Sequence, residues 1–219
     1  MDSKQFDELM KERHSVRYFQ KKEIPENTLK QIITTALQTP SWCNSQAWNI
    51  YVASGKTISE IRNIYNSKSK EGIKGYSDIA PGHRTDSSER SQKTMEQFFK
   101  DVAEFTKDPK MQYLSDSQKV LFNAPTIVYL TLQKGVTEYS ILDLGALEMS
   151  ILLSAKSHGV DSLVAYESIK YPDVLRKFLK VPENENIIIG IALGYEDDNT
   201  INKFRSKKLS LDEACHFFN

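Results

Sequence analysis

The sequence predicts an α+β fold in which helices flank a central sheet. Expected helices and strands are interleaved along the chain without a regular strand–helix repeat, which favours an α+β or three-layer domain over a doubly wound sheet. Two segments, APTIVYLTL at 124–132 and IIIGIALGY at 187–195, are almost wholly apolar, as is typical of strands in the middle of a sheet. A length of 219 residues favours a single domain, which we expect to span residues 1–219.

Each element follows from its own pattern. Apolar spacing and proline or glycine stops predict helices over about residues 3–13, 25–37, 57–65, 98–106, 140–158 and 172–179. Alternation and β-forming residues predict strands at 48–54, 124–132, 161–166 and 187–195. The 140–158 helix is apolar nearly all round, so we expect it to be buried, in the manner of helices that lie between protomers.

Residues 66–93 have a different character. They are polar, contain glycine and hold few aliphatic side chains, so we expect a long loop or mobile excursion. With the helix that follows, we expect a variable lid over about residues 66–120. Its aromatic side chains are candidates for pocket walls, and the alternative is that its phenylalanines pack an ordinary helix: Tyr76, His83, Phe98, Phe99 and Phe105.

Composition excludes several classes of protein. Lysine plus arginine and aspartate plus glutamate each number 29, and this neutrality argues against a nucleic-acid-binding protein. Cys43 and Cys215 are far apart, without metal-ligand or disulfide-framework spacing, which fits a reducing compartment. No apolar run is long enough for a transmembrane helix, and the amino terminus is unlike a signal peptide. We therefore expect a soluble, cytoplasmic protein without membrane contact.

The stretch RHSVR concentrates hydrogen-bonding capacity near the amino terminus. Arg13, Ser15 and Arg17 alternate, so an extended backbone would direct these side chains to one side. Two guanidinium groups and a hydroxyl suit a phosphate or another planar anion, because arginine presents a rigid fork of donors. The alternative is an ordinary solvated loop.

A second polar stretch, TPSWCNSQAW at 39–48, lies between an expected helix and a strand. Its short polar side chains, including Ser41 and Asn44, are able to hydrogen-bond the edge of a heterocycle. A structural turn beside a buried tryptophan is the simpler interpretation for Trp48. Cys43 has no basic neighbour in the sequence that would lower its thiol pKa, so a reactive role for it is not favoured.

A second cationic cluster lies near the opposite terminus. The stretch NKFRSKK carries Arg205, Lys207 and Lys208. A charge run is usually a solvated face, but two small cationic clusters in a neutral protein are able to converge on one anionic ligand.

Familiar alternatives are missing: GIALGY has the wrong spacing for a dinucleotide-binding fingerprint, and there is no GxSxG or HExxH motif.

Taken in order, these segments resemble the FMN-dependent nitroreductase family over nearly the whole chain. ERHSVRYF is similar to the family's RxSxR motif, and LQTPSWCNSQAWNIYV to its second motif. LGALEMSILLSAKSHGV is similar to the dimer-core helix, and AYESIKYPDVLRKFLKVPENENIIIGIALGYED with NKFRSKKLSLDE to the carboxy-terminal signature. Each segment alone is weak, whereas five in the right order are specific.

The resemblance implies a three-layer homodimer with a mixed, mostly antiparallel sheet, an exchanged carboxy-terminal tail, and FMN at the interface. It implies phosphate, ribityl and ring-edge contacts from the amino-terminal motif, with Arg205 and one of the two lysines closing on the phosphate. Partner-protomer residues and a backbone lining complete the implied site. The implied FMN-binding residues are Arg13, His14, Ser15, Arg17, Pro40, Ser41, Asn44, Tyr166, Glu167, Ser168, Arg205, Lys207 and Lys208.

Three positions depart from the family pattern. Ala47 replaces a proline before Trp48, and Val164 stands where relatives often have proline. Lys207-Lys208 replaces a pair that contains arginine, which substitutes point charges for a fork of donors. We expect these changes to affect flavin affinity without removing the phosphate site.

The implied function is FMN-dependent reduction of nitroaromatic or quinone-type acceptors with NAD(P)H, by a ping-pong mechanism. The flavin carries the hydride chemistry, no dedicated acid or base is required, and Arg17 is the candidate for electrostatic stabilisation of the reduced ring. The alternatives are a reductase or dehydrogenase with a narrow natural substrate, a non-catalytic flavin-binding or regulatory protein, and a globular interaction domain without cofactor.

Overall fold

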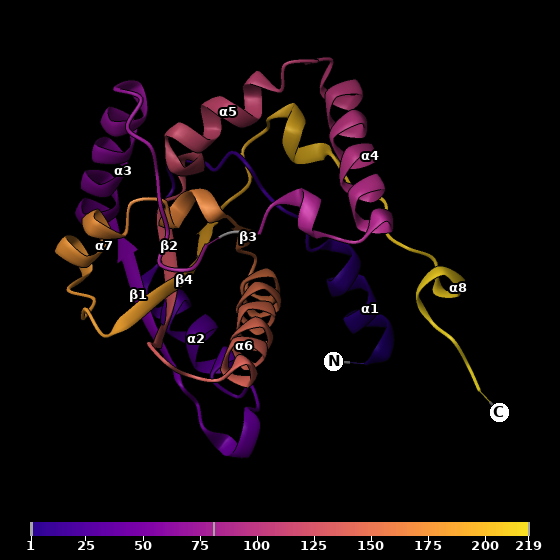
Figure 1. Ribbon diagram of the computed structural model, residues 1–219, viewed down its shortest axis with the longest axis horizontal. Coiled ribbons are helices and arrows are strands. Elements are labelled where there is room, and N and C mark those ends of the chain that lie inside the picture. The colour runs from indigo at the N-terminus through magenta and orange to yellow at the C-terminus, as the bar shows by residue number, and fades with distance from the viewer. Residues whose placement is uncertain (1, 81, 219) are drawn as a thin grey trace.

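The computed structural model describes residues 2–80 and 82–218. Figure 1 shows a central sheet enclosed by helices, with the carboxy-terminal tail extending away from the body. The strands are β1 (Trp48–Ser54), β2 (Thr126–Gln133), β3 (Asp161–Val164) and β4 (Glu185–Gly194), in the order β1-β2-β4-β3. All three strand pairs are antiparallel, and the parallel component expected of a mixed sheet is limited to a bridge between Ser15 and Ser162.

The six expected helices are present, although α3 and α4 are longer than expected, and α5 and α8 were not predicted as helices. Their bounds are α1 (Ser3–Glu12), α2 (Glu26–Ala36), α3 (Gly55–Lys70), α4 (Glu89–Thr106), α5 (Gln112–Lys119), α6 (Glu138–Ser157), α7 (Pro172–Leu179) and α8 (Leu211–Ala214). The α1 helix begins with a capping box between Asp2 and Gln5, which satisfies donors of the first turn. Gly159 ends α6 with a φ of +70°, a conformation that glycine adopts without steric cost.

The three layers follow from the alternation of β2. Ile127 and Tyr129 belong to a core that the sheet shares with α3 and α7. Val128 and Leu130 point to the opposite face and pack in a second core with α2 and α6. Because successive side chains of a strand alternate, a wholly buried strand must be apolar on both sides. The expected α+β three-layer arrangement is confirmed.

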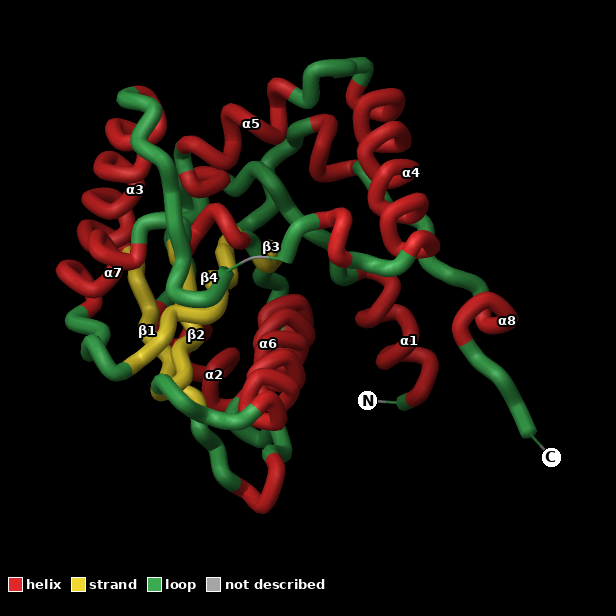
Figure 2. The backbone as a smooth tube through the Cα atoms, viewed as in Figure 1, coloured by secondary structure: helices red, strands yellow, loops and turns green. Residues whose placement is uncertain are grey.

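In the part of the chain that the structure describes, the polar stretch 66–93 is free of α-helix and strand only between α3 and α4, so the expected loop is present but shorter than expected. The α3 helix continues to Lys70 and α4 begins at Glu89. Figure 2 shows the loop after α3 descending alongside the strands. Two interactions fix this loop: the Tyr171 hydroxyl donates to the Ile73 carbonyl at 2.8 Å, and Asp78 accepts from Ile187 N at 2.8 Å.

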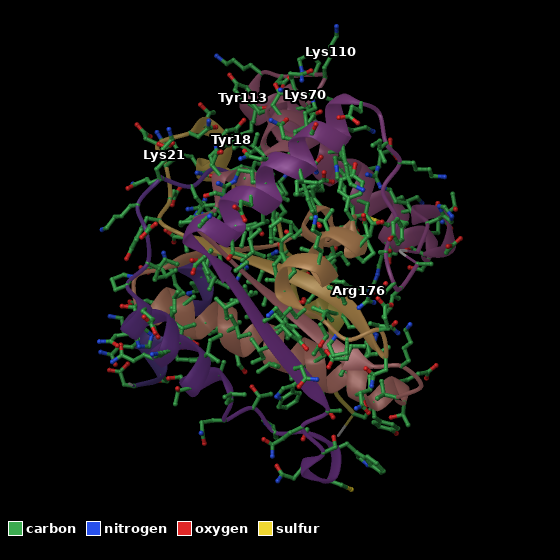
Figure 3. The ribbon with its side chains drawn as sticks, turned by 90° about the vertical axis from the view of Figure 1, so that its left-hand side faces the viewer. Tyr18, Lys21, Lys70, Lys110, Tyr113 and Arg176 are labelled. Atoms are coloured by element: carbon green, nitrogen blue, oxygen red, sulfur yellow. The ribbon has the colours of Figure 1, made fainter. Side chains whose placement is uncertain are left out.

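An ion pair secures the same loop to α7 and β4. Arg176 lies 2.7 Å from an Asp78 carboxylate oxygen, and both side chains are largely buried. Arg176 also donates to the Glu185 carbonyl at 2.8 Å, and Figure 3 shows its side chain beside the strand. A buried pair holds its geometry tightly because breaking it leaves an unpaired charge in a poorly solvated site.

The long helix α6 is buried along part of its surface. Leu144, Leu147 and Ile151 are core residues, whereas Tyr139 and Leu142 are 59% and 69% exposed. The prediction of an apolar helix is therefore confirmed, but the rest of the chain packs against only one side of this helix. Among the described residues, no helix combines the length and apolarity required to span a bilayer.

Candidate functional site

The fold brings the two cationic segments together. The extended stretch after α1 bonds to β3 through Val16 N and the Ser162 carbonyl, at 3.1 Å. The chain after β4 returns across it, and Asp197 N donates to the Tyr18 carbonyl at 3.1 Å. Residues about 180 positions apart in the sequence therefore lie side by side. This convergence was a hypothesis from the sequence, and the structure provides it.

Asn202 joins the two segments and was not singled out from the sequence. Its side chain is completely buried. Its Oδ1 accepts from Arg17 N at 2.7 Å and from Tyr18 N at 3.2 Å. Its Nδ2 donates to the carbonyls of Tyr18 and Asp197, at 2.8 and 2.9 Å. No local pattern reveals this role, because the partners on the amino-terminal stretch are distant in the sequence.

A pocket of about 360 Å³ opens where the segments meet. Four long cationic side chains expected at the site line this pocket: Arg13, Arg17, Arg205 and Lys208. Within the described chain, none of them has a carboxylate at ion-pair distance. A cluster of unpaired cations beside a cavity favours an anionic ligand, because mutual repulsion is relieved only when an anion binds. The lining residues expected from the sequence are Arg13, His14, Ser15, Arg17, Arg205 and Lys208.

The structure distinguishes the two neighbouring lysines. Lys208 lines the pocket, and its ammonium donates to Ser206 Oγ at 3.0 Å. Lys207 is directed elsewhere, with its ammonium 3.5 Å from an Asp101 carboxylate oxygen on α4. Arg205 donates to the Asn202 carbonyl at 2.6 Å, which fixes its guanidinium near the pocket. Lys208 is therefore the lysine in a position to contact an anion in the pocket.

His14 contributes to the wall of the pocket, and one of its two ring nitrogens is hydrogen-bonded. The Nδ1 atom is 2.8 Å from the Glu12 carbonyl. The Nε2 atom is 3.3 Å from a Glu196 carboxylate oxygen, with alignment too poor for a hydrogen bond. His14 therefore contributes to the pocket mainly through its backbone and its position in the wall.

A second cavity of about 270 Å³, called the inner cavity below, adjoins the first. Arg17 and Phe98 border both cavities, so the cationic pocket and the more apolar cavity lie next to each other. Phe99 of α4 covers one side, and Tyr166 and Glu167 lie on the other. Apolar walls with a few polar groups are typical of sites for planar heteroaromatic ligands.

Arg17 is held rigidly at the junction of the two cavities. Its guanidinium donates to the Ser15 carbonyl at 3.0 Å, and its backbone N–H donates to Asn202. Burial lowers the pKa of the Arg17 side chain from its ordinary value, yet arginine stays charged at neutral pH. The site therefore contains a fixed positive charge with little solvent screening.

Three further expected residues of this region differ in their placement. Tyr166 is 40% exposed beside the cavity, and the Glu167 carboxylate pairs with Lys170. Ser168 is completely buried, its hydroxyl finds no partner among the described residues, and its carbonyl accepts from Tyr65 at 2.9 Å. The structure thus places Ser168 in the core, outside the lining of the described cavities.

Pro40, Ser41 and Asn44 do not reach the cationic pocket within one chain. The first two line a separate hollow of about 810 Å³ beside the amino-terminal half of α6. Asn44 lies in the adjoining turn with a φ of +56°, and its side chain accepts from Gln46 at 3.1 Å. Trp42 of the same turn stacks on Tyr139, with ring centroids 5.9 Å apart.

The aromatic residues of the expected lid have separate roles. Phe98 and Phe99 line the inner cavity. Phe105 packs against Phe204 of the tail, with ring centroids 5.6 Å apart. Tyr76 and His83 do not line the inner cavity, since Tyr76 bonds through its backbone to Lys170 and His83 opens the turn before α4.

The fold and these cavities define an α+β protein in which a pocket lined by unpaired cations adjoins a more apolar cavity. A sequence model of the nitroreductase family matches residues 10–195, and the chain belongs to the nitroreductase family. The resemblance noted from the sequence is thereby confirmed.

Individual relatives match over almost their entire length. A 4-nitrobenzoate reductase of Pseudomonas putida is 27% identical over 220 residues, covering 97% of this chain and 95% of the relative. A 4-nitrobenzoate reductase of a Nocardioides species is 26% identical, covering 88% and 81%. The FMN-dependent nitroreductase NfnB of Mycobacterium smegmatis, solved in complex with NADPH, superposes with a TM-score of 0.90 at 25% identity over 100% of both chains.

Proposed function

We propose that this protein is an FMN-dependent oxidoreductase that uses NAD(P)H to reduce nitroaromatic or quinone-type acceptors. One observation supports this most directly: unpaired cations from both ends of the chain line a pocket that adjoins an aromatic-walled cavity. The residues fit FMN, because one end of FMN is a phosphate dianion and the other is a planar ring. Family membership and the FMN-dependent relatives support the same cofactor.

The cationic pocket is the proposed phosphate site. Arg13 and Arg205 offer forked donors, and Lys208 adds a point charge. Ser15, in the extended stretch between the two arginines, is suited to the ribityl hydroxyls, with His14 in the same backbone run. Lys207 supports the site indirectly by linking the tail to Asp101 on α4.

The inner cavity is the proposed ring site. When bound there, the flavin supplies hydride chemistry, accepting from the nicotinamide and giving electrons to the acceptor. Arg17 provides a buried positive charge where negative charge develops on the ring, and a fixed charge in a poorly solvated site acts strongly. Tyr166 and Glu167 present backbone beside the ring, and Ser168 braces that segment from the core. No side chain is assigned as a dedicated acid or base.

The active form is proposed to be a homodimer. The 810 Å³ hollow beside α6, together with exposed Tyr139 and Leu142, is a large apolar surface for a monomer to present to water. In such a dimer, Pro40 and Ser41 would approach the partner's flavin, with Asn44 in the same turn. The exposed Leu211, Phe217 and Phe218 of the tail would pack on the other protomer, giving the exchanged tail implied by the family.

The whole chain, 1–219, is proposed to act as one domain with a lid over about 66–120. Support comes from α4, whose Phe98 and Phe99 lie over the inner cavity. We also propose a cytoplasmic location, in keeping with two free cysteines.

Two measurements test the proposal. The first is the visible spectrum of purified protein, after reconstitution with FMN and desalting. The expected result is a two-band flavin spectrum near one FMN per chain. The second is NAD(P)H oxidation with 4-nitrobenzoate and with menadione, where both acceptors are expected to raise turnover well above that of free FMN.

The possible outcomes separate the competing functions. Retained flavin without acceptor-dependent turnover would indicate a non-catalytic flavin-binding or regulatory protein. Turnover with one narrow class of acceptor would indicate a specialised reductase or dehydrogenase. A protein that remains colourless after reconstitution would contradict the cofactor assignment altogether.

A further inference from the structure

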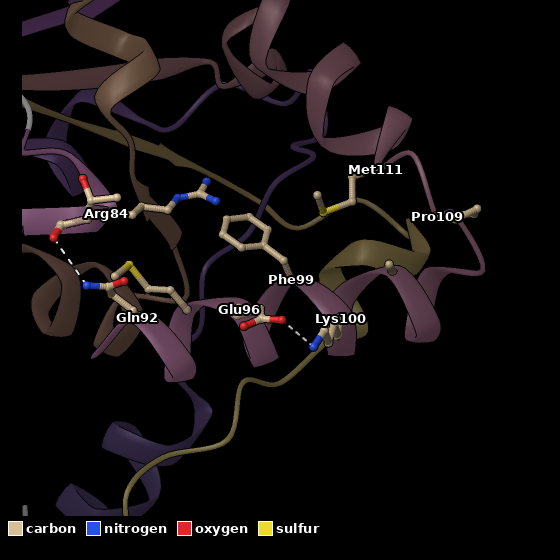
Figure 4. Close-up of a pocket in the computed structure, with 10 residues that line it drawn as sticks. Arg84, Gln92, Glu96, Phe99, Lys100, Pro109 and Met111 are labelled. Carbon is tan, nitrogen blue, oxygen red and sulfur yellow. Dashed lines mark hydrogen bonds and ion pairs between the residues drawn. The ribbon is translucent and has the colours of Figure 1, made fainter. Parts of the chain in front are cut away.

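A further cavity of about 510 Å³ lies on the outer side of α4. Phe99 borders this outer cavity and also the inner one, so the two cavities lie against the same aromatic side chain. Figure 4 shows the nitrogen-bearing end of Arg84 directed toward the Phe99 ring. The guanidinium carbon of Arg84 is 4.1 Å from the ring centroid, a cation–π distance.

The outer cavity has a net positive character. Lys100 and Glu96 also border it, but they pair with each other at 2.6 Å and largely cancel. Within the described residues, Arg84 has no carboxylate at ion-pair distance. Stacking of its guanidinium on Phe99 leaves the N–H edge free, and that edge matches the geometry of a phosphate or carboxylate.

The turn that carries Arg84 is fixed to α4. It covers Arg84–Asp86, and the Asp86 carboxylate accepts from His83 N at 2.8 Å. Gln92 of α4 donates its side-chain amide to the Ser87 carbonyl at 2.8 Å. The cation is therefore presented by a braced turn, which reduces the entropy lost when a ligand binds.

The chemistry of the outer cavity suits an adenosine phosphate. Its apolar walls come from Met95, Ala103 and Met111, and Gln92 and Thr85 supply polar edges. The inner cavity is about half as large, and it is the site assigned above to the flavin ring. A dinucleotide donor that places its nicotinamide at the flavin must place its adenosine half elsewhere within reach. A small acceptor has no second half to fill a separate cavity of this size.

We propose that this outer cavity binds the adenosine half of NADPH, and that Arg84 binds its 2′-phosphate and so sets a preference for NADPH over NADH. The proposal rests on the donor use proposed above. It concerns which donor is chosen, and its binding test does not require turnover.

The direct test uses 2′,5′-ADP and 5′-AMP as fragments of the two donors, measured by calorimetry on the flavin-loaded protein. The wild type is expected to bind 2′,5′-ADP at least about tenfold more tightly than 5′-AMP. Arg84→Gln is expected to abolish that difference. Lys93→Gln is the matched control, because Lys93 is an exposed cation on the nearby helix α4, paired with Glu89 and outside these cavities.

Kinetics provide the second test. In a ping-pong reaction kcat/KM for the donor is independent of the acceptor, so the ratio of NADPH to NADH isolates donor recognition. Arg84→Gln should lower that ratio about tenfold and leave kcat/KM for 4-nitrobenzoate within twofold.

Two results would overturn the proposal. One is equal binding of both fragments to the wild type. The other is an Arg84→Gln variant whose ratio of NADPH to NADH is unchanged, while its kcat/KM falls for 4-nitrobenzoate but not for the neutral amide of that acceptor. This result would assign Arg84 to binding of the acceptor. Fragment binding that depends on Arg84, in a protein without turnover, would support the cavity assignment while the reductase function fails.

Discussion

Replacing Asn202 by leucine is expected to destabilise the protein strongly, because this one buried amide joins the two halves of the proposed phosphate site. Leucine has a similar size, so the substitution removes hydrogen bonds with little change in packed volume. The Arg17 N–H loses its partner at 2.7 Å, and the Tyr18 N–H loses its partner at 3.2 Å. The Tyr18 carbonyl retains a second donor, Asp197 N at 3.1 Å.

The expected magnitude follows from those losses. Two buried N–H groups without acceptors cost about 1–3 kcal/mol each, so the free energy of unfolding should fall by about 4 kcal/mol in total. Asn199→Ala is the control, because Asn199 accepts a single bond from Ile201 N at 3.2 Å at the start of a short turn. Losing that cap should cost only about 1 kcal/mol.

The assay is urea denaturation of the apoprotein at fixed concentration, followed by circular dichroism, with FMN titration of each variant. Asn202→Leu should also weaken FMN binding, because the backbone of Arg17 is held by the Asn202 side chain. A loss of less than about 1 kcal/mol for Asn202→Leu would refute the claim that this amide holds the site together.

Three other predictions concern stability. Asp78→Ala should lower the free energy of unfolding by about 3 kcal/mol in urea denaturation, because it leaves Arg176 partly buried without its partner; a loss close to zero would show that the loop is not anchored there. Gly190→Ala should cost about 1–3 kcal/mol by the same assay, since a Cβ there would lie 2.5 Å from Ser168 Cβ, and full wild-type stability would contradict this packing. Burial raises the pKa of Glu148 above its ordinary 4.5, so the folded state binds this proton more tightly than the unfolded state. Stability contributed by this group is therefore lost as pH rises from 4.5 through the raised pKa. In thermal melts across that range, Glu148→Gln should be more stable than the wild type at pH 7 but not below about pH 4. A stability difference between the two proteins that does not depend on pH would contradict this cause.

Much of the fold is encoded locally and was predictable. The wholly apolar segment that became β2 could only be a strand buried on both faces, and its alternating side chains assign two cores. The helix that became α6 was bounded correctly within about two residues by its periodicity and Gly159. In both cases the local preference agrees with the tertiary environment, which is the condition under which sequence patterns succeed.

The loop after α3 shows where local patterns fail. Its polar residues resemble a mobile segment, yet Asp78 bonds to Arg176 and to the backbone of β4. These partners lie about 100 residues further along the chain, so no window of the sequence contains the interaction. The same reason explains why Asn202 was missed, and why Lys207 and Lys208 were distinguishable only once Asp101 on α4 was in place.

Comparison of FMN with riboflavin tests the central claim most directly. The two ligands share the ring and the ribityl chain, and they differ only in the phosphate assigned to Arg13, Arg205 and Lys208. Titration of the apoprotein should show FMN binding at least about hundredfold more tightly than riboflavin, and Arg205→Gln should remove most of that difference. Equal affinities for the two ligands would contradict the phosphate site, whatever the protein reduces.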